Sequence, residues 1–171
     1  MKYELDRFKT AQKNCYEQVL EEMKNGKKES HWMWYIFPQI EGLGKSDTAK
    51  KFEISNLEEA NYYLKDELLS KRLLELTSIL AYEVDGKTPK EIFGFPDCLK
   101  FHSSMTLFYS VVILNKQFKN NRAFLCFEDA IRKYYDGKLD RLTLENTIKT
   151  NFLSKENSQI VETLLKSNCL M

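Results

Sequence analysis

The sequence has few residues that end regular structure and almost no charge imbalance. Only 6 glycines and 3 prolines occur among 171 residues, and 26 Lys and Arg are matched by 25 Asp and Glu. So few turn-forming residues favour helices joined by short connections. The neutral balance lacks the basic excess of a nucleic-acid binder or of a polybasic membrane-surface protein. We therefore expect no nucleic-acid partner and no membrane attachment.

Long apolar runs and leader features are also missing. The best apolar run, MTLFYSVVIL, covers ten residues, whereas a membrane span needs about 18. The charged N-terminal segment lacks the apolar stretch of a signal peptide. The 4 cysteines are scattered, with no pair at the spacing of metal ligands. We expect a soluble, cytoplasmic protein with free thiols.

What the sequence does contain is helical periodicity. Apolar residues recur at helical spacing, and no run alternates cleanly as a strand would. Helices are predicted over 5–25, from a cap at Ser46, from a cap at Asn56 to about residue 84 in one or two pieces, from a cap at Thr88 to Phe93, from a cap at Asp97 through 118, and over 122–135, 141–150 and 155–167. We predict an all-α fold, a single compact multi-helix bundle of about six to eight helices with short connections. It forms one domain over 1–171, in which 151–171 add an extra C-terminal helix.

The first unusual segment is SHWMWYIFPQ at residues 30–39, which holds both tryptophans and a histidine. A helical turn capped by Ser30 would place Trp34 and Phe37 on one side and His31 on another. Aromatic clusters of this kind are often core. Interleaved polar groups are more typical of a small-molecule pocket, which has apolar walls and a few polar contacts. Both interpretations remain open from the sequence.

The second unusual segment is DCLKFHSSMTLF at residues 97–108. On a helix, Lys100, Ser103 and Ser104 share one face. A lysine and two hydroxyls at that spacing could hold a phosphate or a carboxylate. The alternative is a solvated helix face whose serines bond back to the carbonyl four residues earlier.

Other motifs fail. GLGKS at 42–46 lacks the first glycine of a phosphate-binding loop and the strand that should precede it. Ser103 and Ser104 lack the context of a nucleophile elbow. Only His31 and His102 could serve as imidazole ligands, and no carboxylates cluster around either. We therefore predict neither a metal nor a cofactor.

The two segments, together with DRFKTAQ at 6–12, EEANYYL at 58–64 and YYDGKLDRLTL at 134–144, resemble the signature blocks of the bacterial domain-of-unknown-function family 1810. The resemblance covers nearly the whole chain and weakens after Thr150. It implies a compact helical bundle without an established activity. Members are often labelled calpastatin, but such inhibitors are disordered, whereas a chain with 13% aromatic residues and capped helices should fold.

The resemblance also implies a set of polar signature positions, which are Arg7, Gln12, His31, Gln39, Ser46, Asp97, Lys100, Ser103, Ser104 and Thr106. Packing alone would not need so many polar residues, so the set favours a site. The family is faintly similar to a helical N-glycosidase superfamily that acts on ADP-ribose-like compounds, which is an analogy of fold only.

We therefore expect a helical domain that binds, or binds and processes, a small anionic ligand such as a nucleotide or an ADP-ribose-like compound. Trp34 and Phe37 would stack a planar ring, and His31 would be the general acid or base of any reaction. The other expected ligand contacts are Arg7, Gln12, Gln39, Ser46, Lys100, Ser103, Ser104 and Thr106. The alternative is a non-catalytic protein–protein interaction module, in which exposed tryptophans form the binding patch.

Two geometrical expectations follow. If both segments belong to one site, His31 and Gln39 should lie within reach of the helix that carries Lys100 to Thr106. The helices at 5–25 and 97–115 should also pack as central neighbours, because they carry the most regular apolar stripes.

Overall fold

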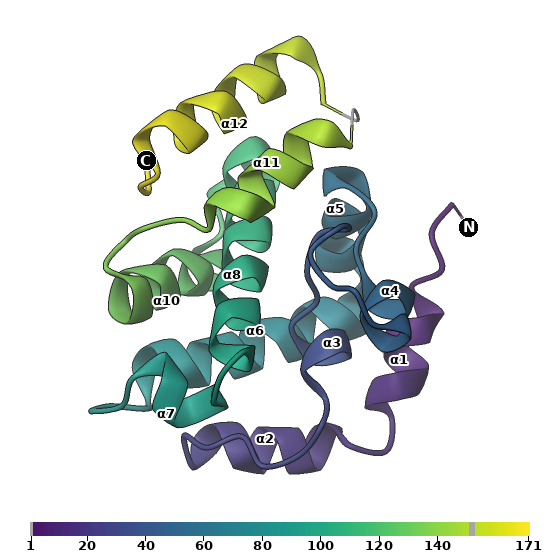
Figure 1. Ribbon diagram of the computed structural model, residues 1–171, viewed down its shortest axis with the longest axis vertical. Coiled ribbons are helices and arrows are strands. Elements are labelled where there is room, and N and C mark those ends of the chain that lie inside the picture. Colours follow the sequence, from purple (N-terminus) through teal and green to yellow (C-terminus); the bar gives the residue numbers. More distant parts are fainter. Residues whose placement is uncertain (1, 151–152) are drawn as a thin grey trace.

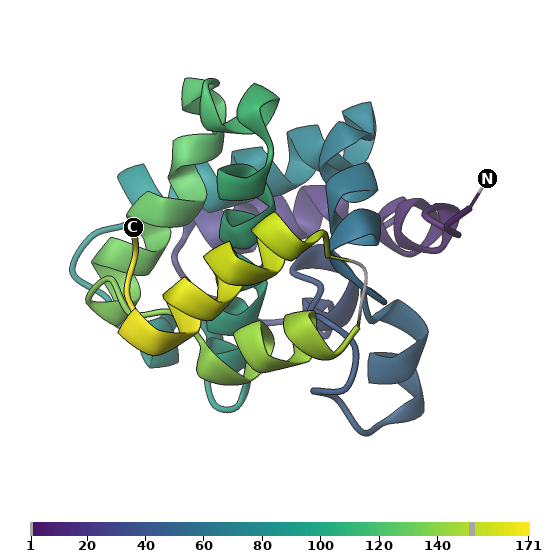
Figure 2. The ribbon, with the colours of Figure 1, turned by 90° about the horizontal axis from the view of Figure 1, so that it is seen from above.

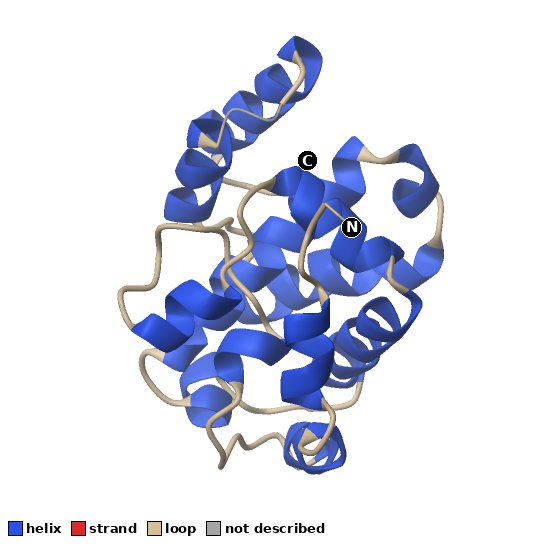
Figure 3. Ribbon diagram, turned by 90° about the vertical axis from the view of Figure 1, so that its right-hand side faces the viewer, coloured by secondary structure: helices blue, strands red, loops and turns tan. Residues whose placement is uncertain are grey.

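The computed structural model describes residues 2–150 and 153–171, which form helices and connecting loops (Figure 3). The elements in chain order are α1 (Asp6–Gln12), α2 (Tyr16–Lys24), α3 (Met33–Ile36), α4 (Asp47–Phe52), α5 (Leu57–Lys65), α6 (Glu67–Tyr82), α7 (Pro89–Phe93), α8 (Asp97–Leu114), α9 (Lys116–Lys119), the 3-10 helix η1 (Arg122–Leu125), α10 (Cys126–Tyr135), α11 (Arg141–Lys149) and α12 (Lys155–Ser167). The β pairing in the described ranges is limited to two isolated bridges, Ile40 with Ile54 and Lys138 with Cys169. None of the helices within these ranges is long and apolar enough to cross a membrane.

The all-α prediction is confirmed, but the described residues form twelve α-helices rather than six to eight. One reason is that the helix predicted over 5–25 is two helices, with a break between Gln12 and Tyr16. The two halves differ in packing, since α1 lies against α3 and α6 whereas α2 lies against α6. Helices this short depend on tertiary packing more than on helix propensity.

Side-chain caps begin new helices inside two longer predicted segments, of which the one from Asn56 was expected in one or two pieces and the one from Asp97 in one. Asp66 accepts a hydrogen bond from Leu69 N at 3.1 Å and begins α6 directly after α5. Asn115 accepts one from Gln117 N at 3.0 Å and begins α9 directly after α8. Each cap satisfies a backbone N–H that has no partner inside the new helix.

Other predicted caps had mixed outcomes. Thr88 and Glu91 form the full capping box of α7, and Asn56 caps α5. Ser30 does not cap a helix, because α3 begins at Met33. Asp97 is the first residue of α8 and not its cap, since its carboxylate contacts two lysines instead.

Helix α8 runs through the middle of the molecule and is surrounded by other helices (Figure 1). Its close neighbours are α5, α7, α10 and α11, and α6 packs against α10 behind it. The predicted central pairing of the 5–25 region with α8 is wrong, because α1 and α2 pack chiefly on α3 and α6. Seen from above, α12 lies beside α11 and over α8 (Figure 2).

A chain of aromatic rings links these helices through the core. Phe8 of α1 contacts Tyr63 of α5, with ring centroids 5.2 Å apart. Tyr63 lies 5.3 Å from Phe108 of α8, which stacks on Phe127 of α10 at 5.7 Å. Ring pairs at these separations add to the stabilisation from burial itself.

Phe108→Ala should therefore lower the free energy of unfolding by about 3–5 kcal/mol, because the Phe108 side chain is fully buried and its loss leaves a cavity. Leu68→Ala on α6 is the matched control, since Leu68 is 40% exposed and should lose far less. Denaturant unfolding of both variants measures the difference. A loss below about 1 kcal/mol for Phe108→Ala would contradict this packing.

Candidate functional site

A cavity of about 410 Å³ lies where the two unusual segments meet, between the chain from α3 to α4 and helix α8. Its volume falls in the range of small-molecule sites. The residues that line it are Trp34, Gln39, Leu43, Gly44, Lys45, Ser46, Ala49, Pro96, Leu99, Lys100, His102, Ser103, Asp140 and Leu142. The site thus draws on α3, α4, α8 and the start of α11.

Lys100 is one of the lysines that line this cavity. Its Nζ lies 5.1 Å from the centroid of the Trp34 ring, within the range of a cation–π contact. It also lies 3.1 Å from Asp97 Oδ1, while Asp97 Oδ2 lies 2.9 Å from Lys28 Nζ. One carboxylate shared by two ammonium groups leaves this cluster with a net positive charge.

Lys28 fixes the first segment against α8. Its side chain is 8% exposed, and its Nζ donates to Ser30 O at 2.5 Å. The Nζ also lies 5.1 Å from the centroid of the Trp32 ring. Because the ammonium group is buried, its contact with Asp97 is hard to break, and the two segments stay together.

Asp140, which also lines the cavity, joins α8 to α11. Its Oδ2 accepts hydrogen bonds from Ser103 Oγ at 3.0 Å, Thr143 N at 3.2 Å and Thr143 Oγ1 at 2.5 Å. Its backbone N donates to Thr106 Oγ1 at 2.9 Å. Ser103 Oγ also lies 3.0 Å from Leu99 O, which is the back-bonded arrangement considered for these serines.

His102 lies on the cavity wall next to Ser103. Burial lowers the pKa of His102, and a hydrogen bond to the Lys138 backbone and the charge of Asp140 oppose this shift only in part. The imidazole is therefore neutral at pH 7. From the sequence, His102 was expected only as a possible imidazole ligand, and Asp140 was not among the predicted site residues. Asp140 directly precedes a predicted helix and has the residue type of a cap, which is the signal that could have indicated it.

The structure brings together five of the predicted site residues and separates six others from them. The five that line the cavity are Trp34, Gln39, Ser46, Lys100 and Ser103. The six that do not are Arg7, Gln12, His31, Phe37, Ser104 and Thr106.

Two of the six require a correction. Phe37, expected to stack a ligand ring, is fully buried, with its ring 5.0 Å from that of Phe101 and edge-on to it. His31, expected to be an acid or base beside Lys100, is exposed and does not line the cavity. The two segments do meet, but through Trp34 and Gln39 and not through the histidine.

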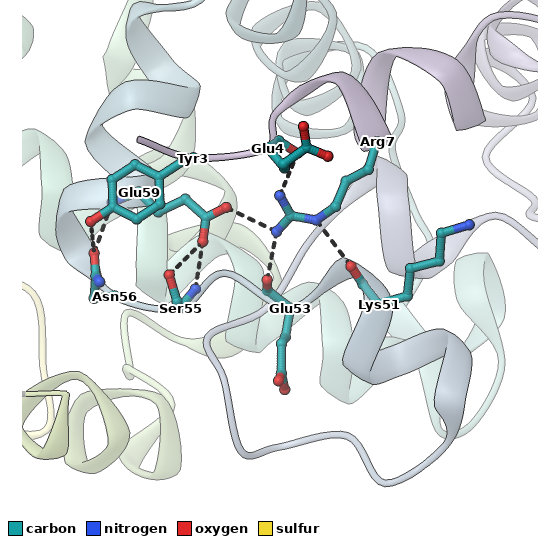
Figure 4. Close-up of polar contacts among 8 residues, drawn as sticks. All are labelled: Tyr3, Glu4, Arg7, Lys51, Glu53, Ser55, Asn56 and Glu59. Carbon is teal, nitrogen blue, oxygen red and sulfur yellow. Dashed lines mark hydrogen bonds and ion pairs between the residues drawn. The ribbon is translucent and has the colours of Figure 1, made fainter. Parts of the chain in front are cut away.

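Arg7 is a structural residue at the junction of α1, α4 and α5 (Figure 4). Its Nε donates to Lys51 O at 2.9 Å, and its Nη2 donates to Glu53 O at 2.8 Å and to Glu59 Oε1 at 2.9 Å. Glu59 is buried and also accepts from Ser55 N at 2.7 Å. The guanidinium is therefore committed to the protein and does not reach the cavity.

Gln12, Ser104 and Thr106 are buried in the helical core. Gln12 Nε2 donates to Tyr35 O at 2.7 Å, which ties α1 to α3. Thr106 Oγ1 is occupied by the backbone of Asp140. Ser104 Oγ has no hydrogen-bond partner within the described residues, and it lies away from the lining of the cavity. Their expected ligand contacts are corrected to roles in the core.

Glu22, which was not among the predicted site residues, holds the start of the first segment. Its carboxylate accepts hydrogen bonds from Glu29 N at 2.5 Å, Ser30 N at 2.9 Å, Ser30 Oγ at 2.7 Å and Trp32 Nε1 at 3.1 Å. Burial by itself raises the pKa of Glu22, but these hydrogen bonds outweigh burial and lower it overall. A long-range contact of this kind leaves no local signal in the sequence.

Comparison with known proteins gives two matches. A family model described as protein of unknown function (DUF1810) matches residues 2–147, which excludes α12. The crystal structure of the conserved hypothetical protein Rv1873 from Mycobacterium tuberculosis is similar, with 44% sequence identity, a TM-score of 0.74, and coverage of 82% of this chain and 94% of that chain. No curated protein matches the chain.

Glu22→Gln should destabilise the protein by about 1–3 kcal/mol at pH 7, because an amide NH2 replaces one acceptor oxygen among several donors. Glu21→Gln, at the exposed neighbouring position, is the control. A lowered pKa means that the Glu22 contribution is complete above the ordinary value of 4.5 and disappears as the pH falls through the folded-state pKa. The gap between wild type and Glu22→Gln in denaturant unfolding should therefore narrow below pH 4.5. A gap that does not change with pH would contradict this role.

Proposed function

The chain belongs to the family described as protein of unknown function (DUF1810), and from its cavity we propose that it binds a small anionic ligand, such as a nucleotide or an ADP-ribose-like compound. The ligand lies between Trp34 and α8. Binding is the proposed activity, and any processing of the ligand would take place at the same position.

The observation that carries the proposal is Lys100 held over the Trp34 ring in a concave site. An ammonium group supplies a point charge for a phosphate or carboxylate. The half-buried Trp34 supplies a face for a planar ring. Lys100 could therefore pair with the phosphate of a nucleotide while Trp34 stacks on its base.

Neighbouring groups support the same ligand class. Lys45 adds a second ammonium group at the cavity. Ser46 Oγ accepts from Ala49 N at 3.1 Å, so its hydroxyl hydrogen remains available to a ligand oxygen. Asp140 is the carboxylate on the wall, and three hydrogen bonds to one of its oxygens spread its charge.

The protein-interaction module stays a second candidate, but not through exposed tryptophans, because Trp32 is buried and Trp34 is half-buried. Other exposed apolar side chains beside the cavity favour it instead. Phe95 is 71% exposed, Leu99 53% and Leu142 59%. Leu99 and Leu142 line the cavity, and Phe95 adjoins Pro96 on its wall. Exposed apolar groups gathered in one place are typical of protein-binding surfaces.

We further propose that this is a cytoplasmic protein and that it comes from a bacterium. The cysteines in the described residues are free, as expected in a reducing compartment. The similar crystal structure comes from Mycobacterium tuberculosis.

Thermal unfolding in the presence of AMP, ADP-ribose and ribose 5-phosphate tests the proposal. A ligand at about 100 times its Kd should stabilise the protein by about 2.7 kcal/mol. Lys100→Ala should remove most of this stabilisation, whereas Lys71→Ala, at an exposed position on α6, should keep it. Absence of any shift with all three compounds would contradict anion binding and would favour the interaction module.

A further inference from the structure

The hydrogen bonding of His102 determines which of its ring nitrogens is free. Nε2 lies 2.7 Å from Lys138 O. A carbonyl oxygen only accepts hydrogen bonds, so Nε2 must carry the hydrogen, and in the neutral ring Nδ1 is then an acceptor. The hydrogen bond thus sets the tautomer of the side chain.

The ring is also held in position. It stacks on the Tyr135 ring, with centroids 3.9 Å apart and planes 10° apart. Tyr135 is itself fixed, because its hydroxyl donates to Cys98 O at 2.6 Å. The chain around Lys138 is tied to the C-terminal segment, where Leu139 N donates to Asn168 O at 3.1 Å. A ring held on two sides keeps its Nδ1 in a constant orientation.

Two acceptor atoms on residues that line the cavity have no hydrogen-bond donor in the described part of the chain. Among residues 2–150 and 153–171, no hydrogen bond reaches His102 Nδ1, and the three bonds to the Asp140 side chain all end on Oδ2, leaving Oδ1 free. Both residues line the cavity, and the charge of Asp140 acts on His102. Lys45 and Lys100 also line it.

A wall with cations and free acceptors is complementary to a ligand that carries both an anion and hydrogen-bond donors. A bare anion would satisfy the ammonium groups of Lys45 and Lys100 and leave the acceptors unpaired. A hydroxyl group is neutral and can donate to an imidazole nitrogen and to a carboxylate oxygen. A phosphorylated sugar contains both the anion and the hydroxyls.

We propose that His102 Nδ1 and Asp140 Oδ1 accept hydrogen bonds from sugar hydroxyls, and that the ligand is a phosphate ester of a sugar. This inference rests on the proposed anion site and specifies its ligand class. His102 is then a specificity-determining residue, which separates hydroxylated phosphate esters from plain ones.

Nuclear magnetic resonance of the ¹⁵N-labelled protein tests the tautomer directly. The chain has 2 histidines, so two imidazoles contribute to the spectrum. At pH 7 His102 should be neutral with its hydrogen on Nε2, and the exposed His31 serves as the internal reference. A His102 ring that is protonated, or that carries its hydrogen on Nδ1, would overturn the inference whether or not a ligand binds.

Titration with ribose 5-phosphate and with butyl phosphate, which lacks hydroxyls, tests the ligand class. Ribose 5-phosphate should bind about five to ten times more tightly and should shift the Nδ1 resonance of His102 but not that of His31. His102→Gln can still donate to Lys138 O but has no ring nitrogen at the Nδ1 position, so its preference for ribose 5-phosphate should fall below that of the wild type. Asp140 Oδ1 should account for the preference that remains. His31→Gln is the matched control and should behave as wild type.

The outcomes separate the two claims. Equal affinity for both esters in the wild type, with no shift at His102, would overturn the sugar inference and leave the anion site in place. Failure of both esters to bind would overturn the anion site and the inference that rests on it. Should His102→Gln fail to fold, the tautomer and the resonance shifts of the wild-type protein still decide.

Discussion

The Asp97 carboxylate, shared between Lys28 and Lys100, is the interaction on which the geometry of the cavity depends. Lys28 fixes the first segment, residues 30–39, to α8. Lys100 contacts the same carboxylate and lies over the Trp34 ring. A buried cation without its counter-charge is strongly destabilising, so the Lys28 contact with Asp97 holds the two segments in register. The same carboxylate therefore holds the fold together through Lys28 and positions Lys100 at the cavity.

The polar residues of the chain divide into two groups with different physical roles. Arg7 and Gln12 donate their hydrogen bonds inside the protein. Through Glu53 O and Glu59, Arg7 links the end of α4 to the start of α5. The second group, including Lys100 and His102, lines the cavity with groups not fully used by the protein. Arg7 of the first group holds α4, which lines part of the cavity, in place. A polar signature position can therefore support the cavity without contacting a ligand.

The sequence predicted features that depend on neighbouring residues and missed those that depend on distant ones. Caps such as Thr88 are local and were identified correctly. The prediction that Trp34 and Phe37 share one side of a helical turn was wrong, because α3 ends at Ile36. Phe37 leaves helical geometry with φ −120° and ψ 74°. The choice between His31 and His102 depended on contacts such as that with Lys138 O, 36 residues away from His102. The presence of two histidines in the sequence could not show which of them lies at the cavity.

Crystals soaked in AMP would test the central claim, that the space between Trp34 and α8 is a ligand site. The account predicts difference density for the base against the Trp34 ring and for the phosphate beside Lys100 Nζ. The ribose should then lie toward His102 and Asp140. Density for AMP elsewhere on the molecule, with this cavity empty although AMP binds in solution, would contradict the account.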